Sequence, residues 1–403
     1  MATKEKKILD KKGCRSTFDL TGEVHIYENT FRINAKSEKS EWIYNQMFMS
    51  VFCGDMSGNV TCESMGGYGD KRTNLIYVHG KNDDGTDDYS NRFTIDWNDR
   101  DDPKILETIG MGCFMNAGLE KDESGKLFIK RFVHNYDFIK YLSEHLTNGM
   151  VVHIRGNLKY NVYKGEVQVR KEVTSVYLVD NATPDKYHAQ FTQTILVNKE
   201  SLGAMDKNTN IAPLDAVVLE YFKTFNDYEV KGNVPIHKNF DVKFDMSTPE
   251  RAKANEIFKK KYLTPRRGYN EIMYDGVFVE GGATVTLTED DLDDDVKLLI
   301  AMGVKTLEEA LQNTATSGAR VYKMVLTSPT IQSIDDGNGR IRNGFASFTE
   351  NKYDDEDLLL DCLIPKSNDD DVSDPEEVLG MNPPTEEKSE EDELADIYAS
   401  LGI

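Results

Sequence analysis

The chain of 403 residues is long enough for two or three domains with at least one well-buried core. Its net charge of −22 is uneven: the last 50 residues hold 18 Asp/Glu against two Lys, a net of −16, which leaves −6 on the rest. The five scattered cysteines form no CxxC pair, which argues against a disulfide framework and a zinc site. The sequence has no run of about 18 apolar residues and no secretory signal at its start, so we expect a cytoplasmic protein with no membrane partner.

The first half of the sequence predicts a flexible N-terminal arm over 1–30 and a β-rich domain over 31–180. A helix is expected over 136–146, where apolar residues recur at helical spacing before Asn148-Gly149. Tyr163-Lys164-Gly165 is expected to turn a hairpin. Short apolar or alternating runs predict strands at 47–53, 75–78, 93–97, 127–133, 150–160 and 167–179.

A second domain of mixed α+β character is predicted over 187–335. Ser247-Thr248-Pro249-Glu250 is typical of a helix start, and that helix should run to about residue 262. Two more helices are expected at 290–302 and 307–315, with strands at 191–197, 272–279 and 321–326. No clear internal repeat is visible. Residues 336–403 are expected to be a linker and an acidic disordered tail, because that segment has too few apolar residues to offset the entropy cost of ordering.

The segment 128–171 carries the strongest functional signal, since its eight Lys/Arg against three Asp/Glu give a local charge of +5. Seven Phe and Tyr side chains are interleaved with these cations. Single-stranded nucleic acid is held in this way, because cations neutralise phosphates and aromatic faces stack on unpaired bases. An exposed strand pair whose aromatic residues belong to the core would have the same composition.

The order of elements between residues 132 and 180 resembles the bacterial and phage single-stranded-DNA-binding protein family. In that family an OB barrel carries a helix before a strand of the type hydrophobic-x-hydrophobic-x-Gly-x-Leu-basic, which Val151, Ile154, Arg155, Gly156, Leu158 and Lys159 match here. The resemblance implies an OB-type five-stranded barrel whose 160–166 loop contacts DNA. It leaves the second domain, over 187–335, as either α+β or OB-like. The chain departs from the family in being more than twice its usual length and in its long segments 79–91 and 98–125, so the family's early stacking positions cannot be aligned. Trp42, Phe48, Phe93 and Trp97 are candidates for them.

A second basic cluster lies at 251–267, with seven Lys/Arg against one Glu. It could extend a DNA path or be an ordinary solvated helix face. The full set of predicted DNA-binding residues is Trp42, Phe93, Trp97, Phe128, Lys130, Arg131, Arg155, Lys159, Tyr160, Tyr163, Lys164, Arg170, Lys171, Lys259, Lys260, Lys261, Arg266, Arg267, Tyr269, Arg320 and Tyr322.

The acidic tail predicts a second activity. An anionic tail would compete with DNA for a cationic groove, and its last residues place an apolar stripe on a short helix that could dock replication or recombination proteins. The predicted docking residues are Leu394, Ile397, Tyr398, Leu401 and Ile403. Acidic tails with apolar ends also recur in the family named above, although this tip lacks its common Pro-Phe ending. A tail that serves solubility alone is the alternative.

The sequence contains no GxxxxGK[ST], GxSxG or HExxH motif, so we expect no enzyme, no cofactor and no metal. The resulting hypothesis is a phage-type protein, in the host cytoplasm, that coats single-stranded DNA during replication or recombination without sequence preference. Two alternatives stay open: a virion or scaffold protein that uses an OB-like barrel to bind protein, and an RNA-binding or recombination-mediator module. The oligomeric state is not predictable from the sequence.

Overall fold

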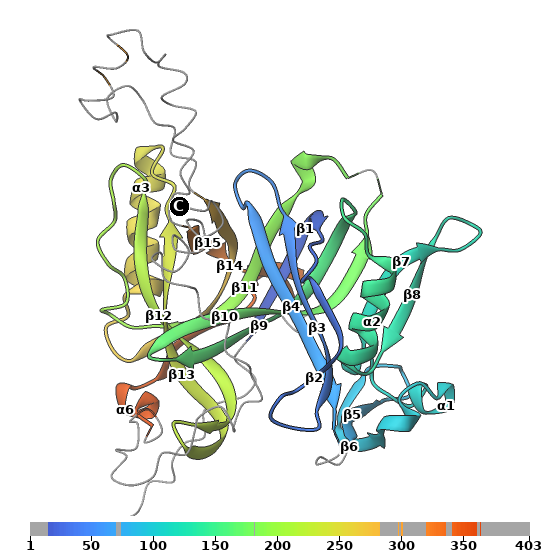
Figure 1. The fold of residues 1–403 in the computed structure, drawn as a ribbon. Helices are drawn as coiled ribbons and strands as arrows, with labels where there is room; N and C mark the ends of the chain where they lie inside the picture. Colours follow the sequence, from blue (N-terminus) through green and yellow to red (C-terminus); the bar gives the residue numbers. More distant parts are fainter. Residues whose placement is uncertain are drawn as a thin grey trace, which may run out of the picture.

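The structure is a computed structural model that describes residues 15–69, 74–180, 182–282, 320–335 and 341–360, with the single residues 297, 300 and 363. This part of the chain is mainly β, as the sequence predicts, and is built around one large mixed sheet (Figure 1). None of its helices is long and apolar enough to cross a membrane.

The strands of the large sheet and of two separate hairpins are β1 (Ser16–His25), β2 (Phe31–Lys36), β3 (Ile43–Phe52), β4 (Asn59–Tyr68), β5 (Leu75–Lys81), β6 (Asp87–Asp96), β7 (Met115–Lys121), β8 (Leu127–Phe132), β9 (Val151–Tyr163), β10 (Glu166–Leu178), β11 (His188–Val197), β12 (Ile211–Phe225), β13 (Tyr228–Lys243), β14 (Tyr269–Gly282), β15 (Arg320–Pro329), β16 (Ile331–Asp335), β17 (Ile341–Phe345) and β18 (Phe348–Tyr353). The helices are α1 (Pro103–Leu106), α2 (Asn135–His145), α3 (Pro249–Phe258) and α6 (Asp355–Leu358), with short turns η1 (Trp97–Asp99), η2 (Met111–Cys113), η3 (Pro184–Lys186) and η4 (Lys259–Leu263).

Five strands of the first half pair in a closed circuit, which we call ring 1. β1 pairs with β3, β3 with β4, β4 in parallel with β10, β10 with β9, and β9 back with β1. The helix α2 lies between the third and fourth of these strands in the chain. Its buried side chains Phe138, Ile139 and Leu142 pack into the core, which explains the helical spacing seen in the sequence.

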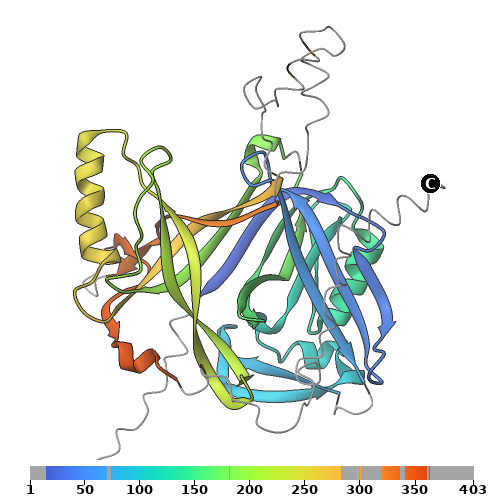
Figure 2. The same ribbon diagram turned by 60° about the vertical axis from the view of Figure 1, so that its left-hand side comes forward.

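Five strands of the second half repeat this circuit, and we call them ring 2. β11 pairs with β12, β12 with β13, β13 in parallel with β15, β15 with β14, and β14 back with β11. The helix α3 again lies between the third and fourth strands in the chain. The chain therefore contains a structural repeat that its sequence does not reveal. α2 and α3 lie on opposite sides of the molecule (Figures 1 and 2).

The two rings meet where their first strands, β1 and β11, pair antiparallel, with Phe18 opposite Phe191. Each phenylalanine packs against a glycine of the fourth strand of its own ring. A Cβ on Gly156 would lie 2.6 Å from the Phe18 ring, and a Cβ on Gly276 would lie 2.3 Å from the Phe191 ring. Both glycines are thus required for the close approach of strands at equivalent positions.

Several elements differ from the sequence predictions. Residues 16–25 form the central strand β1 instead of part of a flexible arm, because Phe18, Leu20 and Val24 alternate inward as buried core residues. In the segment expected to be linker and tail, β18 pairs with β14 and Tyr353 is buried. The helix expected up to residue 262 ends at Phe258 and continues as the π-helical turn η4.

The other predicted elements have mixed outcomes. The strands expected in the first domain and the helix over 136–146 appear as β3, β5, β6, β8, β9, β10 and α2, with shifted ends, and the three strands expected in the second domain as β11, β14 and β15. The helices expected at 290–302 and 307–315 lie outside the described residues except for residues 297 and 300, which are helical. The long strands β12 and β13 were not predicted, and each continues for 15 residues or more.

Candidate nucleic-acid interface

The β9–β10 hairpin carries seven of the 21 predicted DNA-binding residues and extends from ring 1 toward β12 and β13 (Figure 1). Its two strands have 13 residues each. Lys164 and Gly165 form the connection with φ angles of +50° and +84°. Positive φ at both central residues is what a type I′ hairpin turn requires, so the predicted turn at 163–165 is confirmed.

One surface of this hairpin, the outer hairpin face, gathers four of the predicted residues. Arg155, Lys159 and Tyr163 occupy alternate positions of β9, and their side chains are exposed. Arg170 of β10 is the register partner of Lys159 and shares its face. Lys164 stands at the tip with its Nζ 5.3 Å from the centre of the Tyr163 ring. The structure thus brings cations and one 44 % exposed aromatic ring onto a single surface.

The opposite, inner face of the hairpin packs against ring 2. Tyr160 is 3 % exposed and donates its hydroxyl hydrogen to Gln193 of β11 over 2.9 Å. The Lys171 Nζ lies 2.5 Å from Glu280 of β14, and both side chains are buried. Burial removes Tyr160 and Lys171 from any surface that a nucleic acid can reach, so both leave the predicted site. The sequence carries a sign of this inner face. Residues two positions apart on a strand share a face, and those two positions from Tyr160 and Lys171 are the apolar Leu158, Val162, Val169 and Val173.

Three cations of the outer hairpin face already have acidic partners. Arg155 Nε lies 2.9 Å from Asp19, and Lys159 Nζ lies 3.3 Å from Glu220 of ring 2. Arg170 forms an ion pair with Glu63 of β4. These partners are distant in sequence, so the local charge of +5 overstates the attraction of this surface for phosphate. Burial raises the pKa of Glu220, while the neighbouring Lys159 opposes that rise.

The candidate stacking residues of the first domain are divided by their burial. Phe48 of β3 is 56 % exposed and lies opposite Glu63 in register, on the same outward surface as Arg170. Trp42 is half-buried and stacks on Tyr44 with 4.7 Å between the ring centres. Phe93 and Trp97 pack against a small apolar cluster beneath the β5–β6 hairpin. Phe48 is therefore the best placed of the four to meet a base.

The edge strand β8 carries a second exposed group. Phe128 is 54 % exposed, and Lys130 and Arg131 are exposed on the same short strand. Lys130 lies over the Tyr141 ring at 4.8 Å. In Figure 1 this strand and the tip of the β9–β10 hairpin lie on opposite sides of the molecule, so the two groups are not one cluster.

The second basic cluster belongs to ring 2. Lys260, Lys261, Arg266 and Arg267 are exposed, whereas Lys259 is 12 % exposed and lies over the Phe244 ring at 4.3 Å. Tyr269 is buried and leaves the predicted site for the same reason as Tyr160. Tyr322 is 59 % exposed on β15, which begins at Arg320. The predicted docking residues Leu394, Ile397, Tyr398, Leu401 and Ile403 lie outside the described residues.

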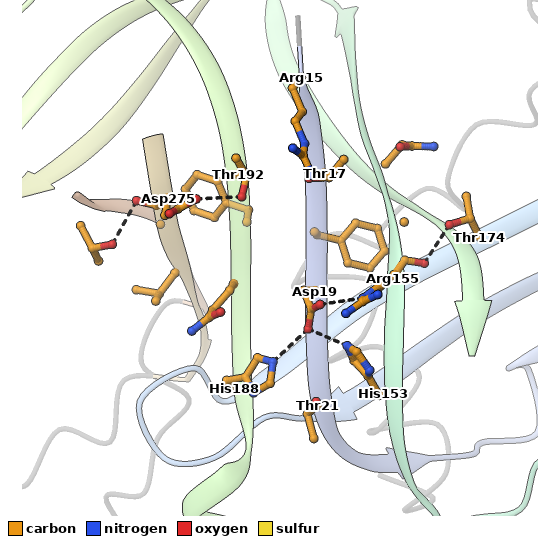
Figure 3. A pocket seen from close by; sticks show the side chains of 18 of the residues that line it. Arg15, Thr17, Asp19, Thr21, His153, Arg155, Thr174, His188, Thr192 and Asp275 are labelled. Atoms are coloured by element: carbon orange, nitrogen blue, oxygen red, sulfur yellow. Dashed lines mark hydrogen bonds and ion pairs between the residues drawn. The ribbon is translucent and has the colours of Figure 1, made fainter. Parts of the chain in front are cut away.

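A polar groove of about 1120 Å³ follows the junction of the rings, where β9, β1, β11 and β14 lie side by side. Asp19 lies at its centre (Figure 3) and accepts hydrogen bonds from His153 at 2.8 Å, His188 at 2.9 Å and Arg155 at 2.9 Å. Burial would raise the pKa of Asp19, but these three donors lower it far below its usual range. The hydrogen bond to Asp19 raises the pKa of His188. This network was not predicted, because Asp19 is 134 or more residues away from each of its three donors.

The groove suits stacking less well than the outer hairpin face. Its two phenylalanines, Phe18 and Phe191, are each 2 % exposed, and its two imidazoles, His153 and His188, are held by Asp19. Its other lining side chains are mostly hydroxyls, amides and paired charges. Base stacking contributes about 1–3 kcal/mol per base in single-strand binding. Because both phenylalanine rings of the groove are buried, they cannot supply this contribution.

Comparison with known proteins gives a short set of similarities. The YorF family model matches residues 71–265. No curated protein matches the chain. Among solved structures, the wild-type single-stranded DNA binding protein from Thermus aquaticus is similar over 66 % of this chain and 86 % of its own, with 8 % identity and a TM-score of 0.28. A deletion mutant of that protein is similar over 66 % and 88 %, with 8 % identity and a TM-score of 0.27. These TM-scores are too low to show a shared fold.

Proposed function

We propose that this protein binds single-stranded DNA without sequence preference and that the outer hairpin face is its main contact surface. Each ring has the pairing order of an OB fold. Its first strand pairs with its second and fourth strands, and its third strand pairs in parallel with its fifth. A helix precedes the fourth strand in the chain. In OB folds the surface of strands 2 and 3 and the loop between strands 4 and 5 bind oligonucleotides. In ring 1 these are β3, β4 and the tip of the β9–β10 hairpin.

The observation that carries the proposal is the placement of Tyr163, Lys164 and Phe48. Exposed aromatic rings occur at the tip and on β3, and the cations Lys159 and Arg170 lie between them. Two stacked bases would contribute about 2–6 kcal/mol in total. This is the larger share of the binding energy, because three of the cations on this surface are already paired with carboxylates.

The paired cations also predict a modest salt dependence. If about two or three phosphates are neutralised, the logarithm of the binding constant falls with the logarithm of salt concentration with a slope of roughly −1.5 to −2 for single strands. A strongly cationic groove would give a much steeper slope.

The test is binding of oligo-dT to the Tyr163→Ala and Phe48→Ala variants at low salt. Each should weaken binding by about 5- to 100-fold, as the loss of one stacked base predicts. Tyr77→Ala is the matched control, because Tyr77 is 81 % exposed on the separate β5–β6 hairpin. Equal affinity of all three variants and the parent would remove this surface from the site. Absence of oligo-dT binding even after deletion of the acidic tail would exclude the DNA function.

The acidic tail is proposed to compete with DNA and to dock replication or recombination proteins. Deletion should start after residue 363, because Leu358 of α6 is buried and Asp354 caps that helix. The deletion should tighten oligo-dT binding, and unchanged affinity would count against competition.

The docking role has its own test, the double variant Ile397→Asp with Tyr398→Asp. It should leave DNA binding intact and abolish capture of a replication or recombination protein that the parent captures. Equal capture by variant and parent would contradict the docking role.

One observation favours a second candidate function. Lys159, Tyr160 and Lys171 all bind groups of ring 2, so the hairpin adds a second connection between the rings beside the pairing of β1 with β11. That role fits a protein-interaction or virion component with an OB-like fold. Oligo-dT, oligo-U and duplex DNA in the same assay separate the alternatives, since preference for oligo-U would indicate an RNA-binding module.

A further inference from the structure

A second polar cluster lies far from the outer hairpin face, where the β5–β6 hairpin meets η2. Cys113 Sγ lies 3.1 Å from His79 Nδ1, and His79 Nε2 lies 3.2 Å from Asp87 Oδ1. A hydrogen on Nε2 donated to Asp87 leaves Nδ1 as the acceptor for the thiol proton. This is the order of nucleophile, base and orienting carboxylate that activates a weak nucleophile in proteins.

The backbone around the cluster is built to hold it. The Gly112 N–H donates to Asp87 Oδ1 over 3.0 Å, and the His79 N–H points at Cys113 Sγ over 3.3 Å. A Cβ on Gly110 would lie 2.6 Å from both Asp87 Oδ1 and His79 Cδ2, and a Cβ on Gly112 would lie 2.8 Å from Asp87 Oδ2. The Gly110-Met111-Gly112-Cys113 segment therefore makes room for the imidazole and the carboxylate.

Neighbouring groups fix the orientation of His79. The Tyr89 ring lies 4.5 Å from the imidazole, tilted by 36°, and its hydroxyl donates to Asp87 Oδ2 over 3.4 Å. The side chains of His79 and Asp87 are 15 % and 21 % exposed. The hydrogen bond from Gly112 lowers the pKa of Asp87 despite its partial burial, so the carboxylate stays charged beside the ring.

Cys113 differs from the other described cysteines in its surroundings. Cys53 and Cys62 are 2 % and 1 % exposed within the core, and burial raises the pKa of the Cys62 thiol to about 12. Cys113 is half-buried, and burial also raises its pKa. Its resting form is thus the thiol, and it becomes a nucleophile only when His79 removes the proton.

We propose that Cys113, His79 and Asp87 form a thiol-exchange site in which Cys113 reacts with small disulfides. The His79 Nδ1 takes the proton from Sγ, and the thiolate attacks one sulfur of the disulfide. The S–S bond of the reagent breaks, a mixed disulfide forms on Cys113, and the departing thiolate takes the proton from His79. No group of the outer hairpin face takes part, so this inference is independent of the DNA proposal.

The test is the rate of reaction with 5,5′-dithiobis(2-nitrobenzoate) at pH 6.5, with the modified residue identified by mass spectrometry. All proteins carry Cys14→Ser and Cys362→Ser, because these two cysteines lie outside the described residues. Cys113 should react while Cys53 and Cys62 do not. His79→Gln should slow the reaction by about 100-fold or more, which is the usual contribution of a general base.

Two carboxylate variants separate activation from structural disturbance. Asp87→Asn should slow Cys113, whereas Asp88→Asn should react like the parent, because Asp88 is a partly exposed neighbour whose carboxylate accepts hydrogen bonds from Ser90 and not from His79. A variant that merely loosened the hairpin would expose the thiol and speed the reaction. Equal or faster reaction of His79→Gln relative to the parent would overturn the proposal.

Discussion

Ring 1 and ring 2 share a pairing order and one packed contact but differ in the polar groups beside it. In both, a phenylalanine of the first strand packs on a glycine of the fourth. The next residues toward the groove are Asp19 and Arg155 in ring 1, which form an ion pair, and Thr192 and Asp275 in ring 2, which form a hydrogen bond of 2.8 Å. The comparison teaches that the buried Phe–Gly contact is kept in both rings, whereas the polar pair beside it, which faces the groove, differs in its chemistry.

The largest effect is expected where the rings depend on each other, at Lys171. Lys171→Met leaves Glu280 buried without its cation, which should lower the free energy of unfolding by about 3–5 kcal/mol. Urea denaturation measures it. The double variant with Glu280→Met is the control and should recover much of the loss, because it removes the unpaired charge. A cost below about 1 kcal/mol for the single variant would show that the rings do not rely on this pair.

The equivalent glycines provide a direct comparison of the rings. Gly156→Ala and Gly276→Ala should each cost about 1–3 kcal/mol through overpacking. Gly156→Ala should cost more, because its Cβ would lie 1.9 Å from the carbonyl oxygen of Glu172, whereas the nearest atom to a Cβ on Gly276 is a ring carbon. Gly232→Ala is the control, since its Cβ would meet nothing closer than 3.6 Å. Three equal thermal shifts would contradict this ranking.

Asp19→Asn tests the ionic character of ring 1 and should cost about 1–2 kcal/mol, reduced by the partial exposure of the site. Since the pKa of His188 is raised, its contribution is complete below about pH 6.5 and is lost as the pH rises through the folded value. Since the pKa of Asp19 is lowered, its contribution is lost only as the pH falls below about 4. The difference between parent and variant should therefore be largest near pH 5–6.

The control for this pH profile is Asp215→Asn. Asp215 pairs with His237 at 3.4 Å, but both side chains are more than half exposed. Solvent screening leaves such a pair with little effect on stability. If the difference in unfolding free energy between the parent and Asp19→Asn did not change with pH, the protonation of His188 would not depend on Asp19.

The smallest effect is expected at the matching position of ring 2. Thr192→Val removes one of the two hydroxyl donors to Asp275, and Thr330 remains at 2.8 Å. The cost should be about 0.5–1.5 kcal/mol, without the pH profile of Asp19→Asn. Thr192→Ser keeps the hydroxyl and should restore most of the stability in the same denaturation assay.

The sequence predicts local features well and long-range ones poorly. The helix α2 and the β9–β10 hairpin follow from spacing and turn residues, and both are present. The second domain was left open between α+β and OB-like, and the sequence could not decide for a repeat of the first, because a single Phe–Gly contact on separate strands leaves no recognisable spacing. The predicted site included Tyr160, Lys171 and Tyr269, which the structure buries, because residue type alone does not say which face of a strand is covered.

The position of β1 has a consequence for how the chain is made. Residues 17–21 of β1 lie between β9 and β11, and Ser16 is the register partner of Gln193. At a translation rate of about 5–20 residues per second, β1 leaves the ribosome roughly 10–30 s before its last partner is synthesised. Vectorial synthesis therefore delivers residues 17–21 of β1 well before β9 and β11, the two strands that flank them. Until β9 and β11 are made, the nascent segment carries the apolar side chains of Phe18 and Leu20 without the two strands that flank them, and it is a natural substrate for chaperones.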